Sequence, residues 1–210
     1  DYLQSLGVNA LWLSPVYRSP NDDNGYDISG YQEIMEEFGT MADWEALRDG
    51  CRARGIRLIM DLVVNHSSDE HPWFAESRSS RDNPKSEYYI WHDPAPDGGP
   101  PNNWASVFGG SAWEFEPRRG QYYLHIFSKK QPDLNWACKA LREELLAMMD
   151  WWAQRGVDGF RVDAISYLEK PQGFPDSPLP PQPDGYSLFN NWAAGSEGTH
   201  RYIRMMHDRV

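Results

Sequence analysis

The sequence repeats one pattern three times, and this repeat limits the fold more than any other feature. Each copy is a helix end, a glycine and then a short apolar strand. The glycine stands where the end of a helix favours a left-handed residue. The copies run from Leu6 to Leu13, from Arg54 to Met60 and from Arg155 to Val162. Such a succession is typical of parallel β/α units, so an α/β fold with a parallel sheet is predicted.

Amphipathic helices are expected before the second and third of these strands. The first starts near Thr40, with Asp43 three residues on in a pattern like a capping box. Its buried stripe consists of Trp44, Leu47 and Cys51. The second starts at Asn135. Its buried stripe consists of Leu141, Leu145, Met148 and Trp152.

Two long irregular stretches interrupt the repeat. The second strand, from Ile56 to Val64, leads into residues 67–134, which are too long for a loop in a compact β/α unit. We therefore predict an inserted subdomain there, with Tyr122 to Phe127 as its best strand candidate. A proline-rich stretch, from Lys170 to Asn190, follows the third strand. The chain then divides into a barrel part (1–66), the inserted subdomain (67–134) and a second barrel part (135–210).

Polar side chains gather where each of the three strands ends. In parallel α/β folds, the carboxyl ends of the strands and the long insertions after them form the active site. Three successive strands with polar residues at this end therefore indicate one shared site. The residues are Asp23, Tyr26 and Asp27 after the first strand, Asn65 and His66 after the second, and Asp163 at the end of the third.

The third strand, Gly159 to Ile165, carries an unusual pair. Side chains alternate across a strand, so Arg161 and Asp163 point the same way, while Phe160 and Val162 point the other way. The arginine favours the ionised form of Asp163 and fixes its position, as a carboxylate nucleophile requires. A purely structural salt bridge is the alternative interpretation.

Composition narrows the classes of partner. The chain has 210 residues, 40% of them apolar, and a net charge of −11, which argues against nucleic acid or an anionic membrane as partner. The 10 Trp and 11 Tyr residues indicate either aromatic packing or, for the loop tryptophans, platforms that stack on sugars. With only Cys51 and Cys138 and no disulfide framework, a reduced cytoplasmic compartment is expected. No signal peptide or membrane span is evident.

Four motifs resemble those of one enzyme family. They are Asp61–His66, Gly159–Ala164, Gln131–Asn135 and Asn24–Ile28. In this order and at this spacing they resemble the α-amylase family (glycoside hydrolase family 13), in its oligo-1,6-glucosidase and α-glucosidase branch. The resemblance implies a partial (β/α)₈ TIM barrel. The chain would hold the second, third and fourth barrel strands, with the inserted subdomain after the third.

The resemblance also implies catalytic roles. Asp163 would be the nucleophile that forms a β-glucosyl-enzyme intermediate, Arg161 would orient it, and Asp61 would support Arg161 from the neighbouring strand. The chemistry would be retaining hydrolysis by two carboxyl groups about 5–5.5 Å apart. The family's general acid, a glutamate, would lie beyond Val210; Glu197 falls at a helix start and is not assigned that role. Residues 1–210 by themselves are therefore expected to be inactive.

Substrate binding is implied in the same way. Tyr26 and His66 would line the glucose subsite, and Asp23 would bind hydroxyls of the non-reducing-end glucose, which makes the enzyme exo-acting. In this branch a small residue after the nucleophile goes with α-1,4 linkages, and here it is Ala164. The expected partners are therefore maltose and short malto-oligosaccharides, with some α-1,6 or sucrose cleavage.

Three alternatives stay open. One is a glucosyl transferase or a sucrose or trehalose isomerase acting through the same intermediate; Gln131 favours the hydrolase over a trehalose synthase. Another is a non-enzymatic ectodomain of an amino-acid transporter, which tends to lack the nucleophile. The third concerns metal: no cofactor is expected, although Asn65 matches a calcium ligand of true α-amylases. The remaining histidines have no ligand spacing.

Overall fold

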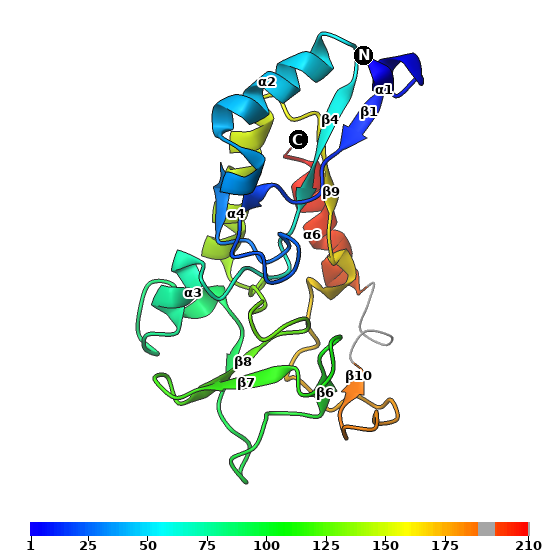
Figure 1. Cartoon of the computed structure of the whole chain (residues 1–210). Coiled ribbons are helices and arrows are strands. Elements are labelled where there is room, and N and C mark those ends of the chain that lie inside the picture. Colours follow the sequence, from blue (N-terminus) through cyan, green and yellow to red (C-terminus); the bar gives the residue numbers. More distant parts are fainter. Residues whose placement is uncertain (189–195, 210) are drawn as a thin grey trace.

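A three-stranded parallel sheet forms one end of the molecule in the computed structural model, which describes residues 1–188 and 196–209. Its strands are β1 (Ala10–Trp12), β4 (Arg57–Leu62) and β9 (Gly159–Val162), in that order across the sheet (Figure 1). They are the three strands of the sequence repeat, so the parallel β/α prediction is confirmed. Strand β9 ends at Val162 rather than at Ile165, because Ala164 has a left-handed φ of 48° and a 3₁₀ turn follows it. Asn190 and Val210, the expected ends of two segments, lie outside the described residues.

Helices accompany this sheet as the repeat requires. Their bounds are α1 (Tyr2–Ser5), α2 (Met41–Arg52), α4 (Lys139–Gln154) and α6 (Glu197–His207). Helix α2 begins with the predicted capping box: the hydroxyl of Thr40 accepts from the backbone N–H of Asp43, and the Asp43 carboxylate accepts from that of Thr40. Among the described residues no helix is both long and apolar enough to cross a membrane.

Two expectations about the helices are wrong. Helix α4 begins at Lys139, not at Asn135, because the Asn135 side chain accepts from the backbone N–H of Ala137 and holds a turn ahead of the helix. In α2, Trp44 and Cys51 are buried but Leu47 is 41% exposed. The stripe of α4 is confirmed, and all four of its predicted residues are buried.

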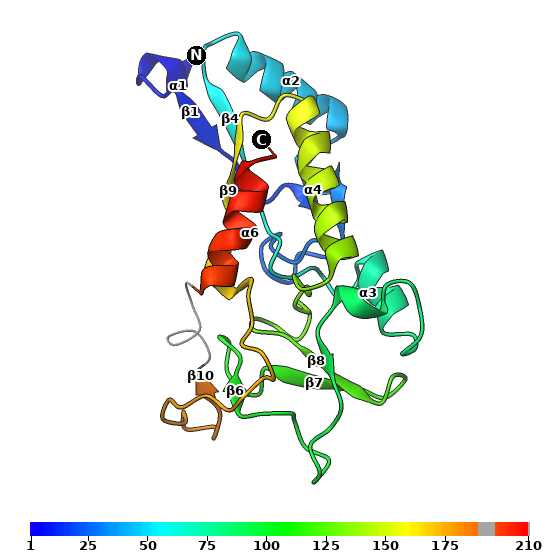
Figure 2. The ribbon, with the colours of Figure 1, turned by 180° about the vertical axis from the view of Figure 1, so that it is seen from behind.

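The other end of the molecule contains the antiparallel strands between β4 and α4 (Figures 1 and 2). Strands β5, β8 and β7 form one sheet, and β10, from the stretch after β9, pairs in parallel with β6. The bounds are α3 (Pro72–Ser77), β5 (Trp91–His92), β6 (Trp104–Ala105), β7 (Trp113–Glu116), β8 (Gln121–Leu124) and β10 (Ser187–Leu188). The division of the chain at 66/67 and 134/135 stays a prediction.

Strand β8 is shorter than expected. It ends at Leu124 rather than at Phe127, because the next backbone groups bond elsewhere. The N–H of His125 donates to the Ala112 carbonyl, and that of Ile126 donates to the carboxylate of Asp133. Likewise β4 covers only residues 57–62 of the apolar run expected from Ile56 to Val64.

Short elements fill the remaining connections. A hairpin of β2 (Tyr17–Arg18) and β3 (Gly30–Ile34) follows β1, and sequence reasoning missed it. The 3₁₀ turns are Glu36–Phe38, Ser86–Tyr88 and Ile165–Tyr167. The last of these directly follows Asp163 and Ala164.

Two tryptophans of the insertion and one just after it serve packing rather than sugar stacking. Trp104, Trp113 and Trp136 are at most 2% exposed. Trp136 also donates its indole N–H to the carbonyl of Val64, which anchors it between the insertion and β4. Rings this deeply buried present no face to a ligand, so the sugar-platform interpretation is wrong for these three residues.

The N-cap residue of helix α3, His71, predicts how stability depends on pH. His71 is 5% exposed, and its Nδ1 accepts from the backbone N–H of Trp73 at 3.1 Å, which requires an unprotonated nitrogen. Burial, with help from Lys85, lowers the pKa of His71 to about 4. Between pH 6.5 and 4 the unfolded chain therefore binds a proton that the native protein does not, so stability falls as the pH falls.

We expect the titration of His71 to lower the free energy of unfolding by about 2 kcal/mol as the pH falls from 7 to 5. Urea unfolding of the full-length protein at both pH values measures the loss. His71→Asn keeps a capping side chain and should show a smaller loss, whereas His200→Asn, on the exposed face of α6, should behave as wild type. Equal losses in wild type and His71→Asn would contradict the assignment.

Candidate active site

One arginine lies between two carboxylates at the carboxyl end of the parallel sheet. Asp61 on β4 pairs in register with Arg161 on β9, and Asp163 follows β9 directly. Nη1 of Arg161 lies 2.9 Å from Oδ2 of Asp61 and 2.7 Å from Oδ1 of Asp163. The same nitrogen also donates to Oδ1 of Asp61. The arrangement fixes the Asp163 carboxylate by a short charge-assisted contact.

The surroundings of this arginine are only partly closed. The side chain of Arg161 is 43% exposed, because β9 has a paired neighbour on one side only among the described strands. Its other flank lies against the ring of Trp12, 5.2 Å from the centroid. Asp61, by contrast, is fully buried. Burial raises the pKa of Asp61 above its usual range, and the Arg161 guanidinium only partly offsets this effect.

Tyr26 joins the same network from the loop after β1. Its hydroxyl donates to Oδ2 of Asp61 at 3.2 Å and lies 3.4 Å from Nη1 of Arg161. Burial and the neighbouring Asp61 raise the pKa of Tyr26. The phenol is therefore neutral. It donates to Asp61 and accepts from Arg161 without adding a charge to the site.

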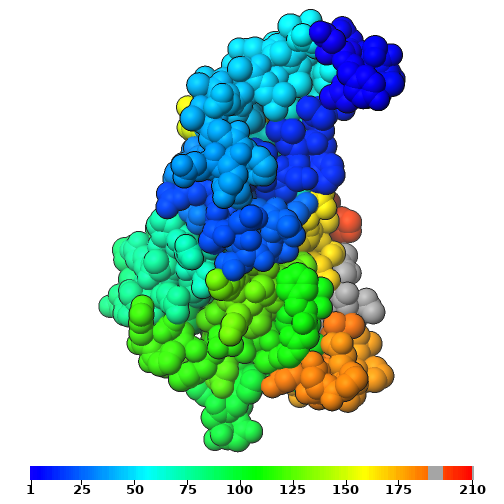
Figure 3. Space-filling view, viewed as in Figure 1, coloured from blue at the N-terminus to red at the C-terminus, as the bar shows by residue number. Residues whose placement is uncertain are grey.

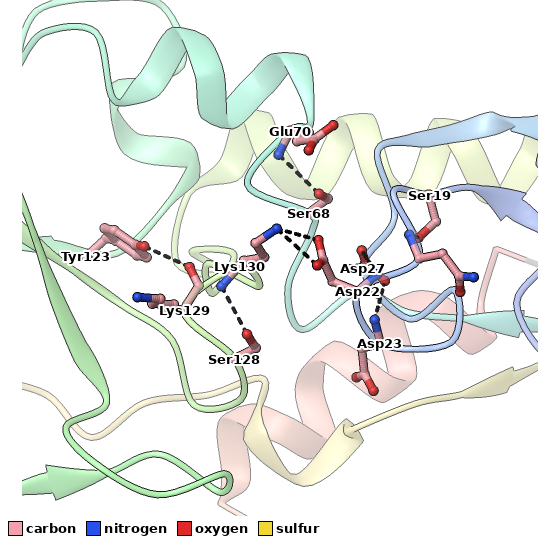
Figure 4. Close-up of polar contacts among 11 residues, drawn as sticks. Ser19, Asp22, Asp23, Asp27, Ser68, Glu70, Tyr123, Ser128, Lys129 and Lys130 are labelled. Carbon is pink, nitrogen blue, oxygen red and sulfur yellow. Dashed lines mark hydrogen bonds and ion pairs between the residues drawn. The ribbon is translucent and has the colours of Figure 1, made fainter.

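The loop that carries Tyr26 is shaped by a buried carboxylate. Asp27 is completely buried, and its two oxygens accept from the backbone N–H groups of Asp22 and Asp23 (Figure 4). Asn21 and Asn24 on either side have positive φ angles of 65° and 49°, a conformation that asparagine tolerates. Asp27 therefore holds the turn that presents Asp23.

Asp23 and His66 meet through a residue to which we had given no site role. The side-chain nitrogen of Gln131 lies 2.9 Å from Oδ2 of Asp23 and 3.3 Å from Nε2 of His66. His66 is 2% exposed, and burial lowers its pKa, so its imidazole is neutral at pH 7. The signal for Gln131 is the motif Gln131–Asn135, which indicates the family and the reaction type but not this contact.

An aromatic residue beside His66 was also missed. The rings of Phe127 and His66 are 5.1 Å apart, and Phe108, which is 61% exposed, packs on the outer side of Phe127 at 6.1 Å. Phe127 comes from the segment that follows β8. Only the close packing of the insertion against β4 places it here, and no spacing in the sequence indicates that.

A buried ammonium lies behind His66, next to Asn65. Nζ of Lys170 is 2.7 Å from Oδ2 of Asp133 and 3.0 Å from Oδ1 of Asn65, and it also contacts the carbonyl of Tyr167. Lys170 is only 4% exposed, and burial lowers its pKa against the opposing effect of Asp133. Carboxylate, amide and carbonyl oxygens are the ligands that calcium prefers. The Lys170 ammonium thus places a positive charge among these oxygens, beside Asn65.

Metal ligation elsewhere has no support in the described part of the chain. No group of three or more His, Cys, Asp or Glu side chains is arranged there to hold a metal ion. Glu197 is the first residue of α6, as expected from the sequence, and not the end of a strand.

Comparison with known proteins supplies the family. The model of the α-amylase catalytic domain matches residues 1–210. An oligo-1,6-glucosidase from Halalkalibacterium halodurans is 57% identical over 211 residues, which is all of this chain and 37% of that protein. An α-glucosidase from Pediococcus pentosaceus is 55% identical over 212 residues, again all of this chain and 37% of the relative. The chain therefore spans little more than a third of these relatives.

Solved structures agree in fold. The trehalulose synthase from Pseudomonas mesoacidophila superimposes with a TM-score of 0.92 at 50% identity, over all of this chain and 37% of that one. The trehalose-6-phosphate hydrolase from Bacillus licheniformis gives a TM-score of 0.92 at 47% identity, with the same coverage. The partial barrel expected from the sequence is thus confirmed.

Proposed function

Because this chain belongs to the α-amylase family, we propose that it is the nucleophile-bearing part of a retaining, exo-acting α-glucosidase. The substrates are maltose and short malto-oligosaccharides. The observation that carries the proposal is the 2.7 Å contact of Arg161 with Asp163, at the strand end where catalytic carboxylates of such barrels lie.

The proposed reaction has two steps. An oxygen of Asp163 attacks the anomeric carbon as the glycosidic bond breaks, and the leaving oxygen takes a proton from an acid contributed by the rest of the barrel. Water then attacks the anomeric carbon of the glucosyl ester and gives its proton to the conjugate base of that acid. Asp163 leaves as a carboxylate, so the released glucose has the α configuration. Arg161 holds the nucleophile in position in both steps, and Asp61 holds Arg161.

Sugar binding is assigned to the neighbouring loops. Tyr26 and His66 line the pocket, with Tyr26 stacking on the glucose. Asp23 accepts hydrogen bonds from hydroxyls of the terminal glucose, which makes cleavage exo-acting. The buried, neutral imidazole of His66 lines the pocket without adding charge to the site.

Linkage preference rests on Ala164. This residue follows Asp163 with a φ of 48°, and its methyl group leaves room beside the scissile bond. A β-branched side chain would be strained at such a φ. Relatives named for α-1,6 cleavage and for α-glucosidase activity match almost equally well, so their names do not decide the linkage. We infer a preference for α-1,4 bonds, with some α-1,6 or sucrose cleavage.

Kinetics of the full-length protein that carries this chain test the proposal. We expect kcat/KM for maltose to exceed that for isomaltose by about 10-fold or more, since a few methyl groups change such ratios by roughly 10- to 200-fold. Proton NMR of the glucose first released from 4-nitrophenyl α-glucoside, whose leaving group is not a sugar, should show the α-anomer. Faster cleavage of isomaltose would contradict the linkage preference, and β-glucose as first product would contradict the retaining mechanism.

A second candidate is isomerisation of sucrose through the same glucosyl intermediate. It is favoured by the 50% identity to a trehalulose synthase, of which one crystal structure holds the substrate sucrose. Chromatography of the products from sucrose separates the two. Glucose and fructose support the hydrolase, whereas trehalulose or isomaltulose as the main product supports the isomerase.

A further inference from the structure

Two loops that are 108 residues apart in the chain meet pairwise beside the candidate site. The Lys130 ammonium lies 2.9 Å from Oδ2 of Asp22, and the amide of the next residue, Gln131, lies 2.9 Å from Oδ2 of Asp23. Figure 4 shows the first pair, with Asp23 beside it. In Figure 3 the corresponding surfaces, blue for the loop after β1 and green for the insertion, lie directly against each other. These contacts join the inserted subdomain to the loop that carries Asp23.

The two contacts differ in strength because they differ in burial. The side chains of Lys130 and Asp22 are 45% and 32% exposed, so water and salt screen their ion pair. Gln131 is completely buried, and its bond goes to a charged acceptor. Such bonds are among the stronger ones in proteins. Of the two contacts, the bond from Gln131 to Asp23 is therefore the one whose loss should change the position of the loop side chains more.

The amide group of Gln131 has a fixed orientation. Its Oε1 accepts from the backbone N–H of Ser128 at 3.1 Å, and its own backbone N–H donates to the Ser128 carbonyl at 2.7 Å. The side-chain NH₂ group must then point toward Asp23 and His66. The assignment of nitrogen and oxygen within the amide thus follows from the backbone around it.

The backbone alone does not fix the orientation of the Asp23 carboxylate. Asp27 fixes the main chain of Asp23 by accepting from its N–H at 3.0 Å, but this leaves the Asp23 side chain free to rotate about its own bonds. The bond from Gln131 to one oxygen of Asp23 sets that rotation. Because the carboxylate is planar and rigid, this bond also sets the direction of its second oxygen.

We propose that Gln131 is a positioning residue that acts through Asp23 to set the affinity of the site for a terminal, non-reducing glucose. The inference rests on the proposed function and adds to it the residue by which the inserted subdomain takes part in substrate recognition. One oxygen of Asp23 accepts from Gln131, and the other accepts from a sugar hydroxyl. Removal of the amide leaves the carboxylate able to turn away from the sugar.

A double-mutant cycle in the full-length protein tests this role. Gln131→Met removes the donor at nearly constant size, and we expect kcat/KM for maltose to fall about 10- to 100-fold, chiefly through a higher KM. In an Asp23→Ala background the same substitution should cost less than about 2-fold, because its partner is already absent. Equal losses in both backgrounds, or no loss in the first, would overturn the proposal.

A matched control separates this from a general effect of losing a glutamine. Gln121 makes the same kind of bond at the surface, from Nε2 to Oδ1 of Asp93 at 3.1 Å. Gln121→Met should leave kcat/KM within about 2-fold of wild type. If the wild-type protein releases no glucose from maltose, the proposed function itself fails. An active wild type with additive losses refutes only the role of Gln131.

A second variant keeps the test decisive if Gln131→Met folds poorly. Gln131→Glu preserves the size and the oxygen that accepts from Ser128 but places a carboxyl group against Asp23, with the neutral His66 as the other titratable neighbour. Two adjacent carboxylates share a proton as the pH falls, and a protonated carboxyl can donate to Asp23. Activity relative to wild type should therefore recover between pH 7 and pH 5. A ratio that stays constant over this range would contradict the proposal.

Discussion

Asp163→Asn in the full-length protein is expected to lower kcat/KM for maltose by about 10⁴-fold or more, with little change in stability. The amide keeps the shape of the carboxylate but cannot attack the anomeric carbon. Nor can it form the ion pair that holds the side chain 2.7 Å from Arg161. Release of glucose from maltose, followed at saturating and limiting substrate, measures the loss.

A matched control and a chemical rescue sharpen this prediction. Asp150→Asn also removes a carboxylate paired with an arginine, Arg209, but on the surface of α4, and should leave activity within about 2-fold of wild type. In Asp163→Gly, added azide can enter the space left by the side chain and attack the anomeric carbon directly. The expected product is β-glucosyl azide, from a single inversion. Unimpaired maltose cleavage by Asp163→Asn would contradict the assignment.

Lys170→Met is expected to destabilise the protein by about 3–5 kcal/mol. The ammonium is 4% exposed and its partner Asp133 is fully buried, so removing it leaves an uncompensated charge in the interior. Asp133 still accepts from the backbone N–H of Ile126 and from Asn65, but neither contact carries a charge. The Asp133 carboxylate then lies buried without a counter-ion.

Urea unfolding of wild type and variant at pH 7 measures this difference. Lys139→Met removes an exposed lysine whose Nζ lies 3.5 Å from Glu143, and it should change stability by no more than about 0.5 kcal/mol. A loss below about 1 kcal/mol for Lys170→Met would show that the buried pair is not what joins Asn65, the insertion and the loop after β9.

Local rules predict the parallel sheet well because each part of the pattern has its own physical cause. Gly55 and Gly156, with φ angles of 68° and 89°, end their helices in the left-handed conformation that the repeat implies. Periodicity in α4 places Trp152 in the core for the same local reason. The strand order then follows from chain order, because parallel neighbours need a helical crossover.

The failures come from particular hydrogen bonds that propensity does not describe. The chain leaves β8 at Leu124 because the next two N–H groups donate to the Ala112 carbonyl and to the Asp133 carboxylate. Asn135 makes a turn because its side chain accepts from the backbone two residues ahead. Gln131 likewise bonds to two separate loops, which no propensity indicates.

The candidate site divides in the same way. Arg161 and Asp163 share a face because strands alternate, and this follows from sequence alone. That Arg161 is half exposed, and that Lys170 supplies the positive charge beside Asn65, depends on how strands and loops pack. Residues two apart at the end of one strand are therefore predictable, whereas residues that meet across the insertion are not.

Mass spectrometry after reaction with 5-fluoro-α-glucosyl fluoride tests the central claim most directly. Fluorine on the sugar slows both steps, but the good leaving group lets the first one proceed, so the glucosyl-enzyme accumulates. The account predicts one added fluoroglucosyl group per protein, located by peptide mapping on Asp163. A label on any other carboxylate, or none while maltose is still cleaved, would contradict it.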